Sequence, residues 1–440
     1  MSYEQSLLFT PEGVRDIYGI ECEKRRKIEA DIHKIMKSYG FKDIQTPTYE
    51  FFDIFNRERG TVASKDMFKF FDQYNNTLAL RPDITPSIAR CVAKYYEQET
   101  MPIRLSYCGS TFIHRRGYQG KMSEISQIGA ELMNDGSSDA DAEMIALTVE
   151  CLAKSGLKEF KIDVGHAGLI RGILEEAHFN KEEIAEYKKY VANKNIFAVE
   201  EMMESQNISA NLKEFLIRLP DLFGGKEVLE YARKCVTRQE AIEALDRLDT
   251  VYDILVSYGL EQNITYDLSM LSHYDYYTGI IFKAYTYGTG EALVTGGRYD
   301  NLIEQFGKKT SAVGLAIVLD QLMNALARKL TLKRINPAFS FCIVLPTVKK
   351  QSKWQMKHVP KAIVSLPCGK MQPRRWSSMK TMQSAIRFPG FFMWKPENVH
   401  NLNAKIPIGG KPNEIYNDCA GKGTFGKTDV TITGTDRHNL

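Results

Sequence analysis

The side chains that could carry out chemistry in this 440-residue chain are concentrated in a few short segments. These segments share carboxylates, hydroxyls, amides and tyrosines, and they comprise residues 81–86, 107–112, 127–131, 272–279 and 295–302. Carboxylate and hydroxyl oxygens are the partners that a buried cation requires, because an unpaired buried charge is costly. Taken singly, each residue is unspecific: Glu131 could be a surface carboxylate on a strand, and Tyr277 could be a core aromatic.

Cysteine and histidine side chains raise the question of metal or thiol chemistry. Cys108, His114 and His273 could line the same site, but their spacing matches no metal-ligand pattern. The eight cysteines include no Cys-x-x-Cys pair, which fits free thiols in a reducing cytoplasm better than disulfides or a zinc centre. We therefore expect these three residues to pack or to line a pocket, and we expect no metal and no cofactor.

In this order and at this spacing, the segments resemble the histidyl-tRNA synthetase family over residues 8–325. The resemblance implies a class II aminoacyl-tRNA synthetase fold with a pocket for histidine. The histidine-binding residues would be Asp83, Thr85, Gln127, Glu131, Tyr276 and Tyr277. By the same resemblance, the first three would hold the α-amino group, and Glu131 with Tyr277 would contact the imidazole ring.

The positions that would hold ATP depart from the family pattern. Adenylation builds negative charge on the α-phosphate, and class II synthetases stabilise that charge with fixed arginines. Here Ile113, Ser272 and Gln321 stand where the family has arginines, and Arg115 stands where it has a glutamate. Losing one such donor costs about 3 kcal/mol of transition-state stabilisation. Three losses together predict a chain that binds histidine without adenylating it. We therefore expect that this chain is not an enzyme.

Synthetase paralogues that combine these features are ATP phosphoribosyltransferase regulatory subunits, which residues 10–17 and 81–86 also resemble. That resemblance implies a non-catalytic subunit that activates a short-form catalytic subunit in the first step of histidine biosynthesis. It also implies that histidine inhibits the complex through feedback. The assembly would be a homodimer, formed through the first motif helix and Pro47, within a hetero-oligomer.

Two other functions stay open from the residues alone. One is a working histidyl-tRNA synthetase with unusual phosphate binding, which ATP–pyrophosphate exchange would reveal. The other is a synthetase-like module that binds tRNA without catalysis, which a gel shift with histidine tRNA would reveal. Residues 1–346 carry 42 Lys and Arg against 49 Asp and Glu, so the body has no general attraction for nucleic acid. No apolar run spans a bilayer and no secretion signal is apparent, so we expect a cytoplasmic protein.

The elements that must position these residues are predicted from hydrophobic periodicity and turn residues. Helices are expected at 22–39, from a Thr85 N-cap and Pro86 onward, at 138–154, throughout an insertion at about 169–257, and within 312–329. Strands are expected at 103–112, 124–132, 158–164, 264–268, 280–285, 292–294 and at the start of 312–329, with a hairpin at 68–80. This order predicts an α+β domain over residues 1–330, with one antiparallel sheet flanked by helices.

The C-terminal part of the sequence does not continue the pattern. Residues 321–396 contain no Asp or Glu, and all three tryptophans lie in that stretch. Residues 331–346 look like the start of a small α/β domain, whereas 347–440 carry 16 Lys and Arg against 5 Asp and Glu and show no period. We interpret 347–440 as a frameshifted, non-native tail, with a basic nucleic-acid-binding tail as the alternative. Resequencing the DNA across codons 345–355 tests this, since an intact reading frame there would refute it.

Overall fold

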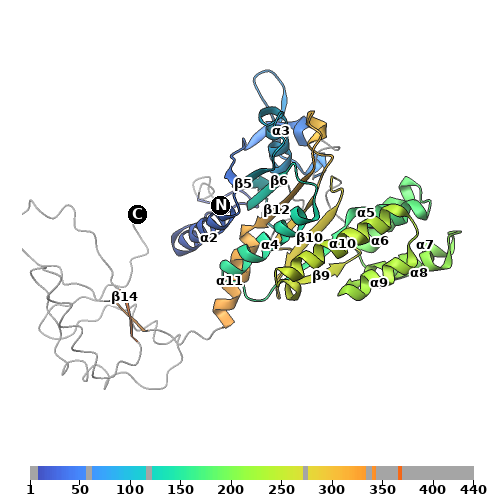
Figure 1. Cartoon of the computed structure of the whole chain (residues 1–440). Helices are drawn as coiled ribbons and strands as arrows, with labels where there is room; N and C mark the ends of the chain where they lie inside the picture. The colour runs from blue at the N-terminus through green and yellow to red at the C-terminus, as the bar shows by residue number, and fades with distance from the viewer. Residues whose placement is uncertain are drawn as a thin grey trace, which may run out of the picture. The chain divides into compact units, whose positions relative to one another are not determined.

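The computed structural model describes residues 8–55, 62–114, 121–270, 276–332, 339–342 and 365–368. The chain divides into two units, Met1–Leu332 and Lys333–Leu440. In the second unit, strands β13 (Phe339–Cys342) and β14 (Ser365–Cys368) pair antiparallel. The first unit contains all the elements described below (Figure 1). Among the described residues, none of the helices combines the length and apolar character needed to cross a membrane.

A nine-stranded sheet forms the centre of the first unit. Its order is β1 (Lys42–Asp43), β5 (Ile103–Phe112), β6 (Glu124–Met133), β12 (Ala312–Val318), β11 (Val294–Arg298), β10 (Ile280–Tyr285), β7 (Lys161–His166), β9 (Ile264–Asp267) and β8 (Phe223–Gly224). The predicted α+β fold with a sheet flanked by helices is confirmed, but the prediction that this sheet is wholly antiparallel is wrong. Its pairs are antiparallel except β1–β5 and β7–β9, so the sheet is mixed. Each parallel pair is joined through a long crossover, which parallel pairing requires.

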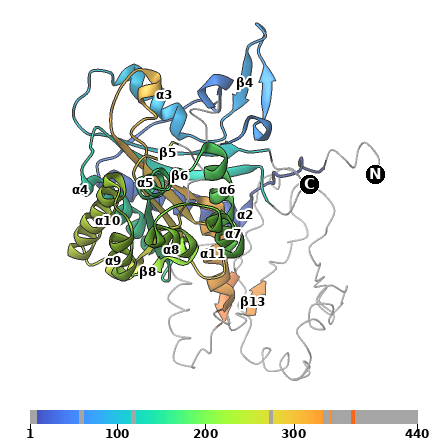
Figure 2. The same ribbon diagram turned by 90° about the vertical axis from the view of Figure 1, so that its right-hand side faces the viewer.

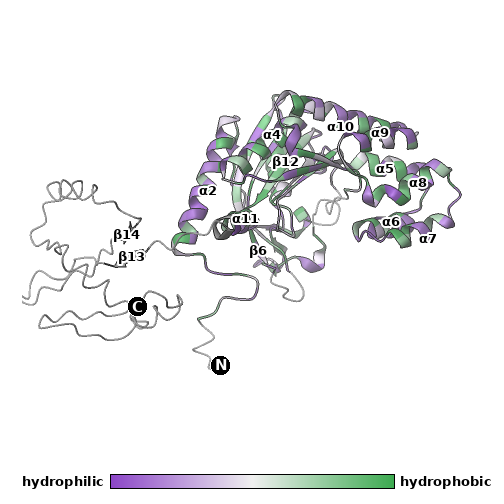
Figure 3. Cartoon of the chain, turned by 90° about the horizontal axis from the view of Figure 1, so that it is seen from below, coloured by the Kyte–Doolittle hydropathy of each residue, from purple (hydrophilic) through white to green (hydrophobic). Residues whose placement is uncertain are grey.

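Helices α2 (Gly19–Ser38), α4 (Ser138–Lys154) and α11 (Leu319–Leu332) flank this sheet. In α2 the buried apolar residues are Ile32, Ile35 and Met36, as the 3.6-residue period predicts. The helix begins three residues earlier than predicted, and Gly40 follows it with a φ of 82°. Figure 3 shows hydrophilic residues along α2 and apolar residues where α4 lies over the strands. The buried side chains of α4 join those of the sheet in one core.

A group of helices lies between β7 and β9 in the sequence and at one end of the sheet (Figures 1 and 2). It comprises α5 (Ala167–Glu176), α6 (Lys181–Ala192), α7 (Ile196–Glu204), α8 (Ala210–Arg218), α9 (Lys226–Cys235) and α10 (Gln239–Ser257). Strand β8 also lies in this stretch and pairs with β9 at the edge of the sheet. Sequence reasoning missed β8 because two residues are too few to show a period.

A three-stranded sheet and helix α3 (Thr85–Tyr95) precede β5. Strands β2 (Tyr49–Phe51), β4 (Thr77–Leu80) and β3 (Lys69–Phe71) pair antiparallel in that order. The predicted hairpin is confirmed, and its turn holds Asn75 at a φ of 60°. The prediction of Thr85 as N-cap is wrong, because Thr85 is already helical and its hydroxyl bonds elsewhere.

Strand β11 also differs from the prediction. It covers Val294–Arg298, whereas the sequence suggested 292–294. Glycine weakens strands, so the two consecutive glycines give no local signal for a longer strand. Both glycines are packed: a Cβ on Gly296 would lie 2.2 Å from the Phe282 ring, and one on Gly297 would lie 2.7 Å from the Tyr277 ring. Aromatic rings therefore cover the strand where ordinary side chains would stand.

Candidate functional site

A polar pocket opens over strands β6, β11 and β12, below the N-terminus of α3. The space it encloses is about 20 Å³, and it reaches about 320 Å³ only when the open solvent at its mouth is included. The lining residues are Asp83, Thr85, Gln127, Glu131, Tyr276, Tyr277, Thr295, Tyr299, Gly314, Leu315 and Ala316. We call it the Glu131 pocket. All six residues that the sequence predicted for histidine binding line it, although they come from three distant parts of the chain.

Glycines shape the floor of the Glu131 pocket. Gly314 of β12 pairs with Glu131 of β6 across the sheet. A Cβ at Gly314 would lie 1.7 Å from Glu131 Oε2, so only glycine leaves space for the carboxylate. Gly297 of β11 similarly makes room for the Tyr277 ring. The glycines thus allow large polar and aromatic side chains to lie flat over the strands.

Glu131 is the most enclosed polar group of the pocket, with 1% of its surface exposed. The Thr85 hydroxyl donates to its Oε1 at 2.8 Å, and the Tyr299 hydroxyl donates to its Oε2 at 2.5 Å. Burial raises the pKa of Glu131 to about 8, and the nearby Asp83 carboxylate acts in the same direction. Burial therefore favours the protonated form of Glu131 at neutral pH.

Asp83 is the second buried acid. Its Oδ1 accepts from the backbone amides of Ile84 at 2.7 Å and Thr85 at 3.4 Å, at the start of α3. Its Oδ2 accepts from the Tyr276 hydroxyl at 3.2 Å. Burial raises the pKa of Asp83 to about 6, against the lowering effect of these hydrogen bonds. The carboxylate is therefore oriented by its own helix and by the aromatic wall.

Three tyrosines form that wall. The ring centroid of Tyr276 lies 4.9 Å from that of Tyr277 and 5.7 Å from that of Tyr299. Sequence reasoning did not assign Tyr299 to the site. The only signal was its place in the Gly-Gly-Arg-Tyr-Asp segment, because nothing local shows that its hydroxyl reaches a glutamate 168 residues away.

The Gln127 side chain adds an acceptor. Its Oε1 is buried and has no hydrogen-bond partner among the described residues. Buried polar atoms are rarely left unpaired in folded proteins, because desolvation without a hydrogen bond is costly. The orphaned oxygen therefore fits a pocket that is completed by a donor on a ligand.

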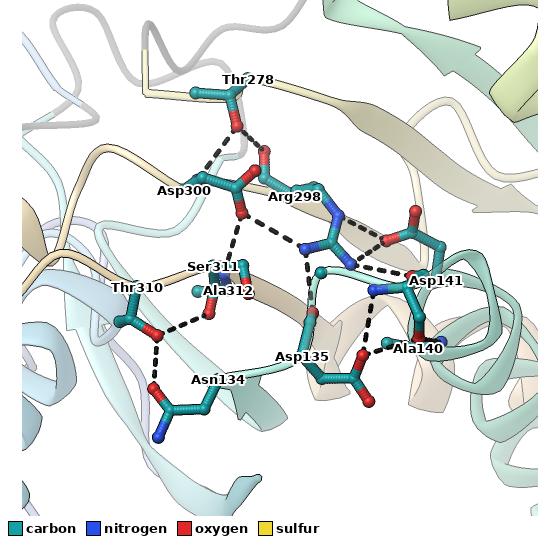
Figure 4. A network of polar contacts seen from close by, with 12 residues as sticks. Asn134, Asp135, Ala140, Asp141, Thr278, Arg298, Asp300, Thr310, Ser311 and Ala312 are labelled. Atoms are coloured by element: carbon teal, nitrogen blue, oxygen red, sulfur yellow. Dashed lines mark hydrogen bonds and ion pairs between the residues drawn. The ribbon is translucent and has the colours of Figure 1, made fainter. Parts of the chain in front are cut away.

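A buried ionic network connects Asp141 and Arg298, through Asp300, to Thr278, which follows the pocket residue Tyr277 (Figure 4). Arg298 of β11 donates from Nε to Asp141 Oδ1 of α4 at 2.8 Å, and Arg247 of α10 donates to Asp141 Oδ2 at 2.8 Å. Arg298 also donates to Asp300 at 3.3 Å. The Asp300 backbone amide donates to the Thr278 hydroxyl at 3.0 Å, which fixes the segment after Tyr277. The network thus joins the sheet, α4 and the helical group.

The positions predicted to have lost ATP contacts lie apart from these residues. Ile113 is half-buried just beyond β5, and its amide donates to the Ser123 carbonyl at 2.9 Å. Gln321 donates to Glu291 at 2.9 Å, and Lys121 pairs with the same carboxylate at 2.8 Å. Ser272 and Arg115 lie outside the described residues, as does His273. Cys108 and His114 do not line the Glu131 pocket; the His114 ring lies 5.4 Å from that of Phe68.

The raised pKa of Glu131 gives an expected pH dependence of stability. Between its ordinary pKa of 4.5 and about 8, the folded chain binds a proton that the unfolded chain has released. The free energy of unfolding should therefore fall as pH rises through this range. Asp83, with a pKa of about 6, acts in the same direction at lower pH. Burial lowers the pKa of His166 to about 3, so below pH 6.5 this residue makes the free energy of unfolding rise with pH.

The range from about pH 7 to 8 isolates Glu131, and urea unfolding across it measures the effect. The ligand-free chain should be less stable at the higher pH, and the Glu131→Gln variant should lose this slope. An equal slope in both proteins would show that another group carries the proton.

Comparisons with known proteins agree with this architecture. A profile of the histidyl-tRNA synthetase family matches residues 13–322. Curated relatives described as ATP phosphoribosyltransferase regulatory subunit include one from Acetivibrio thermocellus, 37% identical over 73% of this chain and 77% of that protein. Another, from Ruminiclostridium cellulolyticum, is 39% identical over 73% of this chain and 77% of that protein. The solved structure of an ATP phosphoribosyltransferase regulatory subunit/histidyl-tRNA synthetase from Bacillus halodurans is 33% identical, with a TM-score of 0.68 over 73% of this chain and 83% of that chain.

Proposed function

Because the chain belongs to the histidyl-tRNA synthetase family and, within it, to the ATP phosphoribosyltransferase regulatory subunits, we propose that it regulates a short-form ATP phosphoribosyltransferase by binding histidine in the Glu131 pocket. It activates the catalytic subunit in the first step of histidine biosynthesis, and bound histidine reverses the activation. The chain itself carries out no step of the reaction. It works in the cytoplasm as a homodimer within a hetero-oligomer.

The observation that carries this proposal is the composition of the Glu131 pocket. Two buried carboxyls, an amide oxygen without a partner among the described residues, and three tyrosine rings suit a small ligand with cationic nitrogens and a planar ring. Asp83 and Gln127 hold the α-ammonium, with the Thr85 backbone orienting Asp83. Glu131 accepts from the imidazole, and Tyr277 packs against it. The Thr85 hydroxyl donates to Glu131, whereas the sequence suggested that Thr85 holds the α-amino group.

The ATP side supports a regulatory role without adenylation. The amide of Gln321 donates to Glu291, so an acid stands next to the position where the family has a phosphate-binding arginine. The Lys121 ammonium is already paired with Glu291. A triphosphate there would face a carboxylate, which is unfavourable for negative charge.

The test is the phosphoribosyltransferase rate of a short-form catalytic subunit with and without this chain, across a histidine titration. We expect the chain to raise the rate and histidine to lower it again. ATP–pyrophosphate exchange serves as the control, and we expect none. An unchanged rate, also with a frame-corrected gene, together with exchange activity would instead identify a histidyl-tRNA synthetase.

A further inference from the structure

The Glu131 pocket has an unusual charge composition. It contains two carboxyl groups, Asp83 and Glu131, while the described residues that line it include no Lys, Arg or His. Both acids are buried, with 8% and 1% of their surfaces exposed. Two carboxylates in one small pocket repel each other, and each loses solvation. Among the described residues no basic side chain lines the pocket, so we infer that protons or a cationic ligand balance these charges.

The hydrogen bonds around Glu131 select what can approach it. Thr85 and Tyr299 each have one hydroxyl hydrogen, and both donate it to this carboxyl group. Two such donors favour the carboxylate over the protonated acid. In the described part of the chain, the other titratable groups around it are acidic or phenolic, namely Asp83, Tyr107, Tyr276, Tyr277 and Tyr299. Once ionised, Glu131 therefore accepts best from a cationic donor on the ligand.

We propose that the Glu131 pocket binds histidine with its imidazole ring protonated, so that an ammonium and an imidazolium meet the carboxylates of Asp83 and Glu131. The inference rests on the proposed function, because it takes histidine as the ligand. The proton that Glu131 holds in the empty pocket moves to a ring nitrogen: its O–H bond breaks as the N–H bond forms. No further reactant is needed, and the product is a charge-assisted hydrogen bond enclosed by the protein.

Nitrogen NMR of ring-¹⁵N-labelled histidine bound to the full chain tests this directly. At about pH 7.5 the ring of free histidine is mostly neutral, and only one of its nitrogens carries a hydrogen. In the complex, we expect both ring nitrogens to shift to imidazolium positions. In the Glu131→Gln variant, which keeps size but loses charge, we expect the bound ring to stay neutral. The matched control Asp83→Asn should bind more weakly and still show the imidazolium.

The outcomes separate the inference from the proposed function. A neutral ring in the wild-type complex would overturn the inference while leaving histidine binding intact. An absence of binding by a folded wild-type chain would instead overturn the proposed function. If Glu131→Gln fails to fold or to bind, the wild-type spectrum alone decides.

Discussion

Replacing Asp141 with alanine is expected to lower the free energy of unfolding by about 3–5 kcal/mol, because it leaves a buried guanidinium without its carboxylate. Asp141 is fully buried, and Arg298 is 5% exposed. The carboxylate accepts from Arg298 and from Arg247, which lie on different elements. The remaining partners of Arg298, Asp300 and two backbone carbonyls, compensate only in part.

Urea unfolding of the wild type and of Asp141→Ala measures this loss. The matched control is Glu21→Ala, which breaks the ion pair between Arg15 and Glu21, whose side chains are each 45% exposed. Exposed pairs contribute about 0–1 kcal/mol, so this variant should stay close to the wild type. A loss below about 1 kcal/mol for Asp141→Ala would mean that Asp300 and water replace the ion pair.

The Asp141 variant should also weaken the histidine binding that we propose for the Glu131 pocket. Arg298 and Asp300 position Thr278, and Thr278 directly follows the pocket tyrosines Tyr276 and Tyr277. Loosening this connection increases the freedom of the aromatic wall, which must then be ordered when the ligand binds. The effect is indirect, so conditions that keep the variant folded should still reveal it in calorimetry.

Replacing Gly314 with alanine is expected to weaken the proposed histidine binding strongly while the fold persists. The new methyl group would lie 1.7 Å from Glu131 Oε2 and 3.2 Å from the Ala130 carbonyl oxygen. Glu131 must therefore move, and its hydrogen bonds with Thr85 and Tyr299 break. Disturbing one partner of a buried, hydrogen-bonded charge pair costs 2 kcal/mol or more, which corresponds to a loss of affinity of about 30-fold or more.

Isothermal titration calorimetry measures the affinity of Gly314→Ala, and unfolding measures its stability, which should fall by about 1–3 kcal/mol from overpacking. Gly290→Ala is the control, because a Cβ there meets nothing within 4 Å. Unchanged histidine affinity in Gly314→Ala would place the ligand outside the Glu131 pocket.

Much of the fold and of the site was predictable from the sequence. Strand β5 coincides with its predicted range, and β10 does so as well. Long strands and amphipathic helices can be recognised from the local periodicity of apolar residues, without knowing which element they pack against. The pocket residues were predictable because Asp83, Gln127, Glu131 and Tyr277 stand in segments whose order resembles the family pattern, and the structure brings them together.

Other features depended on contacts between distant residues. The sequence by itself determined which elements form and which side chains are available to the site. Only the tertiary structure decided that the Thr85 hydroxyl turns away from its own helix to Glu131, and that Tyr299 closes the other side of that carboxylate. It also decided that Asp141 pairs with Arg298, 157 residues further along. The physical reason is that a buried polar group takes whichever partner the packed sheet places within hydrogen-bonding distance, and local sequence does not encode that neighbour.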